Sequence, residues 1–217
     1  MSTIEGIVGD IAVALQEKNQ ARDRALVETR HTVRHSANAI RALHRGQTAQ
    51  AKEHLAEGRS MIGATRRDLE GHPDIYWAGY VQDSHKEYAE ANLVAAMIND
   101  ESLPGPGDIG VELAPYLNGM AEAASEMRRY VLDIIRRGGP EETRQAERIL
   151  GVMDDVYTSL ITVDYPDGIT GGLRRTVDAL RAVLERTRGD LTISIRQDAL
   201  ARALAGASGI QGSNETL

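Results

Sequence analysis

Cysteine and phenylalanine are absent from this sequence, and tryptophan occurs only once. Without cysteine, the chain has no disulfide, no thiolate metal site and no cysteine nucleophile. The core must therefore consist of aliphatic side chains and tyrosine. No uninterrupted apolar run is long enough to span a bilayer, and the first residues lack the basic and apolar regions of a signal peptide. We therefore expect a cytoplasmic protein without a membrane partner.

Acidic residues outnumber basic residues, which gives a net charge of -7, but the charge is unevenly distributed. From residue 18 to residue 45, seven basic residues stand against two acidic residues. A basic stripe along a helix can follow a phosphate backbone, whereas a solvated helix face explains the same pattern equally well. The candidate contacts to nucleic acid are Lys18, Arg22, Arg30, Arg34, Arg41 and Arg45.

Nearly every segment shows the helical repeat of apolar residues, and the interruptions contain glycine or proline. The expected helices span residues 4–45, 48–70, 74–98, 108–137, 140–162 and 172–205. No strand is required. With 217 residues and 41% hydrophobic content, the chain is predicted to form one all-α domain over residues 1–205. Residues 206–217 are expected to form a disordered tail.

Three apolar stripes define the predicted core faces of these helices. The first helix begins with Ile4, Val8, Ile11 and Leu15. The third helix carries Trp77, Val81, Ser84, Tyr88, Ala91, Ala95 and Ile98. The fourth helix carries Leu113, Leu117, Met120, Ala124, Met127, Val131 and Ile134.

Two acidic pairs are the main candidates for chemistry. Glu87 and Glu90 are three residues apart and Glu122 and Glu126 are four apart, so each pair lies on one helical face. Two antiparallel helices would bring the four carboxylates into one cluster. Mg²⁺ prefers hard oxygen ligands, and two such ions can clamp both oxygens of a phosphodiester displacement. The pattern therefore suggests a metal-dependent nuclease.

The surroundings of the two pairs differ. Glu87 and Glu90 share a stripe with Tyr80, Val94 and Met97, so we expect them to be partly buried and to need a metal or an arginine as partner. The second pair, at positions 122 and 126, lies opposite the core stripe of its helix. On a surface helix these residues would be ordinary solvated glutamates.

Several motifs resemble the translin family. Its C-terminal half is similar to residues 153–160, 164–167, 171–178 and 185–191. The segments Glu87–Ala91 and Tyr116–Glu122, together with Ser125 and Glu126, resemble the Trax branch. The similarity extends over nearly the whole chain, from the basic first helix to the last helix. The order and spacing of the motifs identify the chain as Trax-like.

The resemblance implies a bundle of long antiparallel helices that assembles into a closed, octamer-like shell around RNA. In this family, Trax supplies a Mg²⁺-dependent endoribonuclease, for which Mn²⁺ is an alternative ion, and translin binds nucleic acid. Glu87, Glu90 and Glu126 match catalytic and metal-binding positions of Trax, and Glu122 stands where Trax has aspartate. The family enzyme pairs Trax with translin, whereas simpler members form homo-oligomers.

From these features we expect a Trax-type endoribonuclease acting on single-stranded RNA, flexible strands or small duplexes inside a homo-oligomeric shell. Two alternatives remain at this point. The first is a translin-like shell that binds RNA or single-stranded DNA without cleaving it. The second is a helical protein-interaction adaptor, in which Glu87 and Glu90 pair with arginines.

Overall fold

The computed structural model describes residues 3–211, with side chains described to residue 205. Over this part of the chain, every regular element is a helix, and the predicted all-α fold class is confirmed. The elements are α1 (Ile4–His44), α2 (Thr48–Asp68), α3 (Pro73–Tyr76), α4 (Gly79–Asn99), α5 (Pro106–Ile109), α6 (Leu113–Arg137), α7 (Pro140–Leu160), α8 (Asp167–Thr170) and α9 (Leu173–Gln211).

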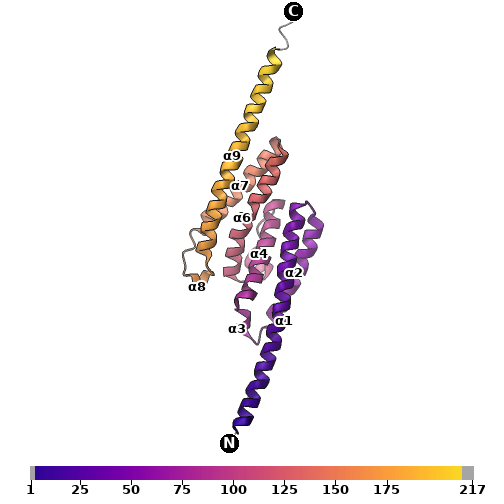
Figure 1. Ribbon diagram of the computed structural model, residues 1–217, viewed down its shortest axis with the longest axis vertical. Coiled ribbons are helices and arrows are strands. Elements are labelled where there is room, and N and C mark those ends of the chain that lie inside the picture. The colour runs from indigo at the N-terminus through magenta and orange to yellow at the C-terminus, as the bar shows by residue number, and fades with distance from the viewer. Residues whose placement is uncertain (1–2, 212–217) are drawn as a thin grey trace, which may run out of the picture.

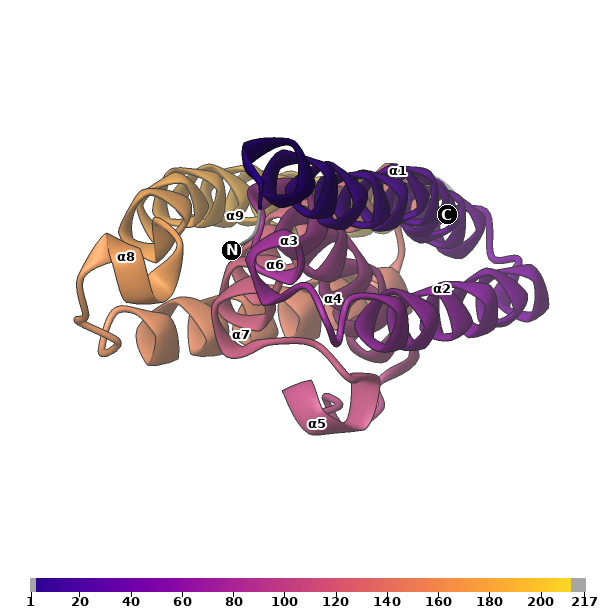
Figure 2. The ribbon, with the colours of Figure 1, turned by 90° about the horizontal axis from the view of Figure 1, so that it is seen from below.

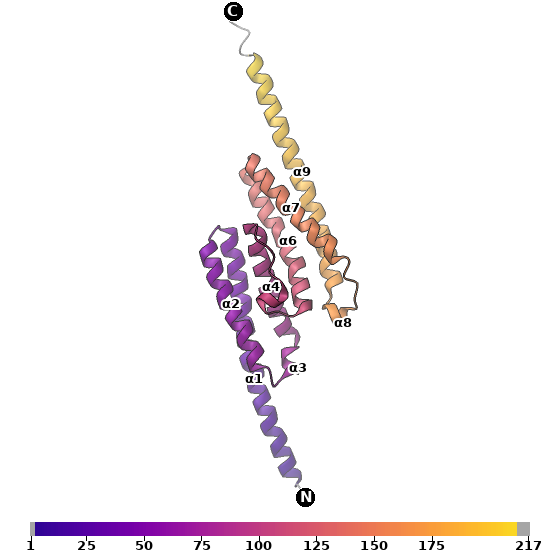
Figure 3. The ribbon, with the colours of Figure 1, turned by 180° about the vertical axis from the view of Figure 1, so that it is seen from behind.

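The six long helices lie side by side along the longest axis of the molecule (Figure 1). Helices α4 and α6 occupy the middle of the bundle, with α1 and α2 packed on one side and α7 and α9 on the other (Figure 3). Viewed along the bundle, short helix α5 lies outside this arrangement (Figure 2). Short turns join α1 to α2 and α6 to α7, which makes the members of each pair antiparallel.

The core is aliphatic, as the lack of phenylalanine predicted. Its largest fully buried side chains are supplied mainly by α4, α6, α7 and α9, and they include Tyr88, Leu93, Met127, Ile134, Ile149, Met153, Leu180 and Leu184. Because α4 and α6 are covered on both sides, residues away from their main apolar stripes are also shielded from solvent. This packing on both sides of α4 and α6 partly shields their acidic pairs from solvent.

Two of the predicted helices are interrupted near their beginnings. The expected helix over 74–98 is divided into α3 and α4, because Ala78 adopts an extended conformation as the N-cap of α4. Trp77 therefore leaves the core stripe and is 59% exposed. The expected helix over 108–137 is likewise divided into α5 and α6. Leu113 becomes the first residue of α6 and is 70% exposed, so its predicted core position is wrong.

Helices α1 and α9 extend beyond the bundle at opposite ends of the molecule (Figure 1). The stripe of Ile4, Val8, Ile11 and Leu15 is helical as predicted, but all four side chains are exposed because α2 does not reach them. At the other end, α9 continues to Gln211, past the predicted end at residue 205. The rest of the expected tail, residues 212–217, lies outside the described residues. No helix in the described part of the chain is both long and apolar enough to cross a membrane.

Candidate functional site: an acidic cluster between α4 and α6

A glycine sets the distance between α4 and α6. A Cβ atom added to Gly119 would lie 2.7 Å from the backbone oxygen of Lys86 and 3.0 Å from the backbone nitrogen of Glu90. Any larger residue at this position would push the two helix backbones apart. The close approach places the acidic pair of α4 opposite the acidic pair of α6.

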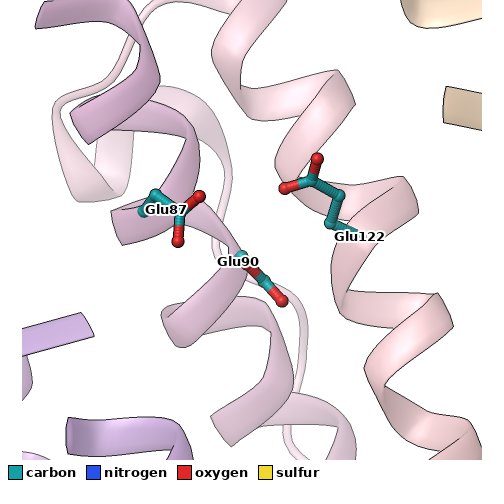
Figure 4. Close-up of side chains that lie close together, drawn as sticks. All are labelled: Glu87, Glu90 and Glu122. Atoms are coloured by element: carbon teal, nitrogen blue, oxygen red, sulfur yellow. The ribbon is translucent and has the colours of Figure 1, made fainter. Parts of the chain in front are cut away.

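Three of the four predicted carboxylates converge at this contact. One side-chain oxygen each from Glu87, Glu90 and Glu122 lie within 4.8 Å of one another, and all three residues are partly buried. Figure 4 shows Glu87 and Glu90 on α4 and Glu122 on the facing turns of α6. We call these three residues the acidic cluster. Its formation corrects the alternative that Glu122 is an ordinary solvated glutamate.

Glu126 lies at the edge of the acidic cluster and has a different partner. Its Oε1 lies 2.7 Å from Nε2 of His44, a side chain on α1 that is only 3% exposed. The single four-carboxylate cluster expected from the sequence is therefore a cluster of three with a fourth, histidine-bound carboxylate beside it. In the sequence, His44 lies between Arg41 and Arg45 of the basic stripe, but nothing there indicated a contact with a residue 82 positions away.

Lys86 is a site residue that the sequence analysis did not select. Its Nζ lies 2.9 Å from Oε1 of Glu122 and 3.5 Å from Oε1 of Glu87. Burial lowers the pKa of Lys86, but the hydrogen bond and charge of Glu122 and the charge of Glu87 outweigh it, so the pKa lies above its ordinary value. Lys86 is therefore cationic and partly neutralises the acidic cluster. Lys86 directly precedes Glu87 in the sequence, and this position was the only feature of the sequence that linked it to the site.

Glu90 is the residue of the acidic cluster whose ionisation is opposed by its surroundings. Burial, followed by the negative charges of Glu87, Glu122 and Glu126, raises its pKa to about 8. Among the described residues, Glu90 makes no hydrogen bond or ion pair that would hold its ionised form. Neither Glu87 nor Glu90 pairs with an arginine in this part of the chain, contrary to the pairing that the adaptor alternative requires.

The composition of the acidic cluster fits a divalent cation. It offers several convergent, hard oxygen donors, and one lysine leaves a surplus of negative charge when the carboxylates are ionised. A bound cation would lower the pKa of Glu90 by stabilising its carboxylate. Mg²⁺ is held in this way, by a few carboxylates and water, and a cluster without sulfur or a convergent histidine suits Mg²⁺ or Mn²⁺ better than zinc or copper.

The predicted basic contacts, which lie on α1 and at its C-cap Arg45, fall into two groups. Arg30, Arg34, Arg41 and Arg45 are all exposed and share one side of the helix, as predicted. Arg41 is also three residues before His44, so this group lies beside the helix face that reaches Glu126.

Lys18 and Arg22 belong to the second group. Helical spacing puts them on the face of α1 that bears Ala21 and Ala25, and Nζ of Lys18 lies 2.5 Å from Oδ2 of Asp74. The structure therefore brings four of the six predicted basic contacts together and separates the other two from them.

No protein-family model matches the sequence. The uncharacterized protein MJ0175 of Methanocaldococcus jannaschii is 27% identical over 184 residues, which cover 84% of this chain and 80% of that protein. The structure of AfC3PO in complex with duplex RNA has a TM-score of 0.81 at 29% identity and covers 88% of this chain and 97% of its own.

Two further crystal structures are similar to this chain in fold. The crystal structure of AfC3PO has a TM-score of 0.80 at 28% identity, with the same coverage of 88% and 97%. The crystal structure of apo-NeC3PO has a TM-score of 0.76 and covers 86% of this chain and 96% of its own, but at 17% identity it supports the fold alone.

Proposed function

We propose that this chain, whose similarity to C3PO structures supports the translin/C3PO family, is a Trax-type endoribonuclease with the acidic cluster as its Mg²⁺-dependent catalytic centre. The observation that supports this proposal best is the convergence of Glu87, Glu90 and Glu122 within 4.8 Å, with one lysine against three carboxylates. A cluster with this charge imbalance is stable as an ionised set only with a cation.

RNA is the proposed substrate. One similar structure, that of AfC3PO, is a complex with duplex RNA. On this chain, the exposed Arg30, Arg34, Arg41 and Arg45 form a basic surface beside His44, which itself binds Glu126. A backbone held along this surface would be directed toward the acidic cluster.

Each site residue has a proposed role in phosphodiester hydrolysis. Glu87, Glu90 and Glu122 would hold Mg²⁺ or Mn²⁺, and the bound ion would supply Lewis-acid activation of the attacking water and of the phosphate. Glu126, oriented by His44, accepts the proton of the attacking water. Lys86, whose Nζ lies 2.9 Å from Oε1 of Glu122, would pair with a phosphate oxygen at the acidic cluster. The strand is thus aligned for in-line attack with most of the catalysis supplied by positioning and charge.

Assembly into a homo-oligomer completes the proposal. The projecting end of α1 exposes Ile4 (81%), Val8 (58%), Ile11 (53%) and Leu15 (60%) as one stripe. A contiguous apolar stripe of this kind on a helix without a neighbour is typical of a surface that packs against another chain. An octamer-like shell made of copies of this chain would cover it. A monomeric mass in solution would contradict the shell.

The decisive experiment is cleavage of end-labelled single-stranded RNA in Mg²⁺ and in EDTA. We expect cleavage only with Mg²⁺, and a loss of about 100-fold or more in the Glu87→Gln/Glu90→Gln variant, since cation stabilisation of the transition state amounts to several kcal/mol. The matched control is Glu141→Gln/Glu147→Gln, which removes two exposed carboxylates from α7 and should cleave normally. If RNA binds but stays intact with every divalent ion, the non-catalytic shell replaces the nuclease.

A further inference from the structure

A cavity of about 440 Å³ opens beside the acidic cluster, between α4, the beginning of α6 and α8. This volume falls within the usual range of small-molecule sites. Its walls include Trp77, Asp83, Lys86, Glu112, Leu113 and Ile169. Apart from Lys86, none of the residues that line this cavity has a proposed role in hydrolysis.

The cavity and the acidic cluster share Lys86, which lines the cavity and hydrogen-bonds Glu122. On α6, Asn118 lines the cavity and lies four residues before Glu122. On α4, Asp83 lies four residues before Glu87. The cavity is therefore about one helical turn, or roughly 5.4 Å, along both helices from the acidic cluster.

The only tryptophan of the chain forms an exposed wall of this cavity. Trp77 is 59% exposed, whereas Tyr88 and Tyr116 are buried in the core. Its ring packs edge-on against Tyr76, with centroids 5.3 Å apart and planes at 85°. Tyr76 is itself fixed, because its hydroxyl donates a hydrogen bond of 2.6 Å to Glu112, which also binds Arg66. Trp77 thus presents an indole surface from a rigid support.

The acidic residues that line the cavity disfavour a phosphate inside it and favour a neutral ring. Asp83 and Glu112 are acidic, and the ammonium group of Lys86 is engaged by Glu122. The remaining wall is partly apolar, with Leu113 and Ile169 among its residues. A nucleobase meets these conditions, because it is flat and uncharged, stacks on aromatic rings and carries N–H donors for carboxylates.

We propose that this cavity receives an unpaired nucleobase of the RNA strand whose neighbouring phosphate lies at the acidic cluster, with Trp77 stacking on the base. The inference rests on the proposed function, since it assigns a base-binding subsite to the same strand. A base can enter only when it is unpaired, so the cavity selects single-stranded or flexible segments over continuous duplex. Stacking accepts any base, so the selection is for strand state more than for sequence.

The fluorescence of Trp77 provides a direct test, because the chain has no other tryptophan. The full-length protein is titrated in EDTA, where no cleavage occurs, with single-stranded RNA or with an abasic oligonucleotide of equal length and charge. We expect RNA to quench the fluorescence and the abasic strand to leave it unchanged. Equal quenching by both strands, or RNA binding without quenching, overturns the inference.

Variants separate stacking from a general effect on the surface. Trp77→Ala should weaken binding of single-stranded RNA about tenfold or more, without changing the binding of the abasic strand, and Trp77→Phe should largely restore it. The control is Tyr165→Ala, because Tyr165 is a 65% exposed aromatic residue that lines a different cavity. Circular dichroism and solution mass check that Trp77→Ala leaves the fold and assembly intact.

The outcomes also distinguish this inference from the proposed function. Base-dependent quenching without any Mg²⁺-dependent cleavage rejects the nuclease and keeps the base subsite. Cleavage that depends on the acidic cluster, without base-dependent quenching, keeps the nuclease and rejects the subsite. A fluorescence change with protein concentration alone shows that a second copy of the chain covers the cavity, which also rejects the subsite.

Discussion

The two sides of α6 show how different partly buried charges can be. Toward α9, Arg128 binds Oδ2 of Asp190 at 2.7 Å and Oγ1 of Thr187 at 3.3 Å, so this contact contains one cation and one anion. Toward α4, Glu122 lies beside Glu87 and Glu90, and Lys86 pairs with Glu122 and Glu87. The first arrangement satisfies its charges within the chain. The second does so only if a cation binds, because protonation of Glu90 still leaves two carboxylates against one lysine.

This difference indicates which polar contacts carry function. A balanced pair needs nothing from solution, and its removal affects packing and stability alone. An unbalanced cluster destabilises the folded chain when it is ionised. Such clusters are therefore typical of sites that bind a ligand or catalyse a reaction. We therefore propose a structural role for Arg128 and Asp190 and a chemical role for the acidic cluster.

The largest expected effect comes from a comparison in which one carboxylate on each side of α6 is replaced by its amide. Glu90→Gln should lower Mg²⁺-dependent RNA cleavage by about 100-fold or more, because it removes a charged ligand. Asp190→Asn should leave cleavage within about twofold and lower the free energy of unfolding by about 1 kcal/mol or less, since the pair is partly exposed. Cleavage assays and urea titrations measure the two effects. Loss of cleavage in Asp190→Asn would contradict the division into a structural and a catalytic side.

The next effect concerns the support of Glu126. His44→Ala removes the group that lies 2.7 Å from Oε1 of Glu126 and should reduce cleavage by about 10- to 100-fold, the usual loss when a carboxylate loses its orienting partner. Tyr130 is the matched control, because its ring lies near His44 without bonding Glu126. Tyr130→Phe keeps that ring and should retain normal cleavage. An active His44→Ala enzyme would show that Glu126 needs no orientation.

A smaller effect is expected from the spacing between α4 and α6. Gly119→Ala places a methyl group 2.7 Å from the backbone oxygen of Lys86, and the required helix shift should lower the free energy of unfolding by about 1–3 kcal/mol. Cleavage should fall with it, because the acidic cluster widens.

Gly151→Ala in α7 is the control for Gly119→Ala. A Cβ atom there meets nothing within 4 Å, so the higher helix propensity of alanine should stabilise the protein by up to about 1 kcal/mol. Urea titrations of both variants test the comparison. Equal stability of the two variants would mean that the close contact does not restrict α4.

The smallest expected effect is the pH dependence of stability in EDTA. The pKa of Glu90, about 8 in the folded chain and 4.5 ordinarily, means that the folded state binds the proton more tightly. This stabilisation is complete below pH 4.5 and is lost as the pH rises through 8, with a slope of at most about 1.4 kcal/mol per pH unit.

The range from pH 6.5 to 8 isolates this contribution. Burial lowers the pKa of His85 from 6.5 to about 4, so the stabilisation from neutral His85 is lost only below pH 6.5. Urea titrations at fixed protein concentration should show stability falling from pH 6.5 to 8 in the parent chain. The slope should be smaller in Glu90→Gln. An unchanged slope in this variant would mean that another group takes up the proton.

The sequence by itself determined the helices and the acidic pairs. Apolar repeats and glycine or proline stops placed the six long helices, because helix formation depends on local propensity and on one apolar face. The spacing of Glu87 and Glu90 predicted a shared face, and the apolar residues in the same stripe predicted their partial burial. The breaks at Ala78 and before Leu113 were missed, since the flanking residues continue the helical repeat while the backbone turns.

Only the tertiary structure decided which residues meet. It brought Glu122 to Glu87 and Glu90 through the close contact at Gly119, added Lys86, and joined His44 to Glu126 across 82 positions. It also left the first stripe of α1 exposed and placed Trp77 on a cavity wall. Periodicity states which residues share a helix face, but the neighbour that covers this face is set by packing among distant segments.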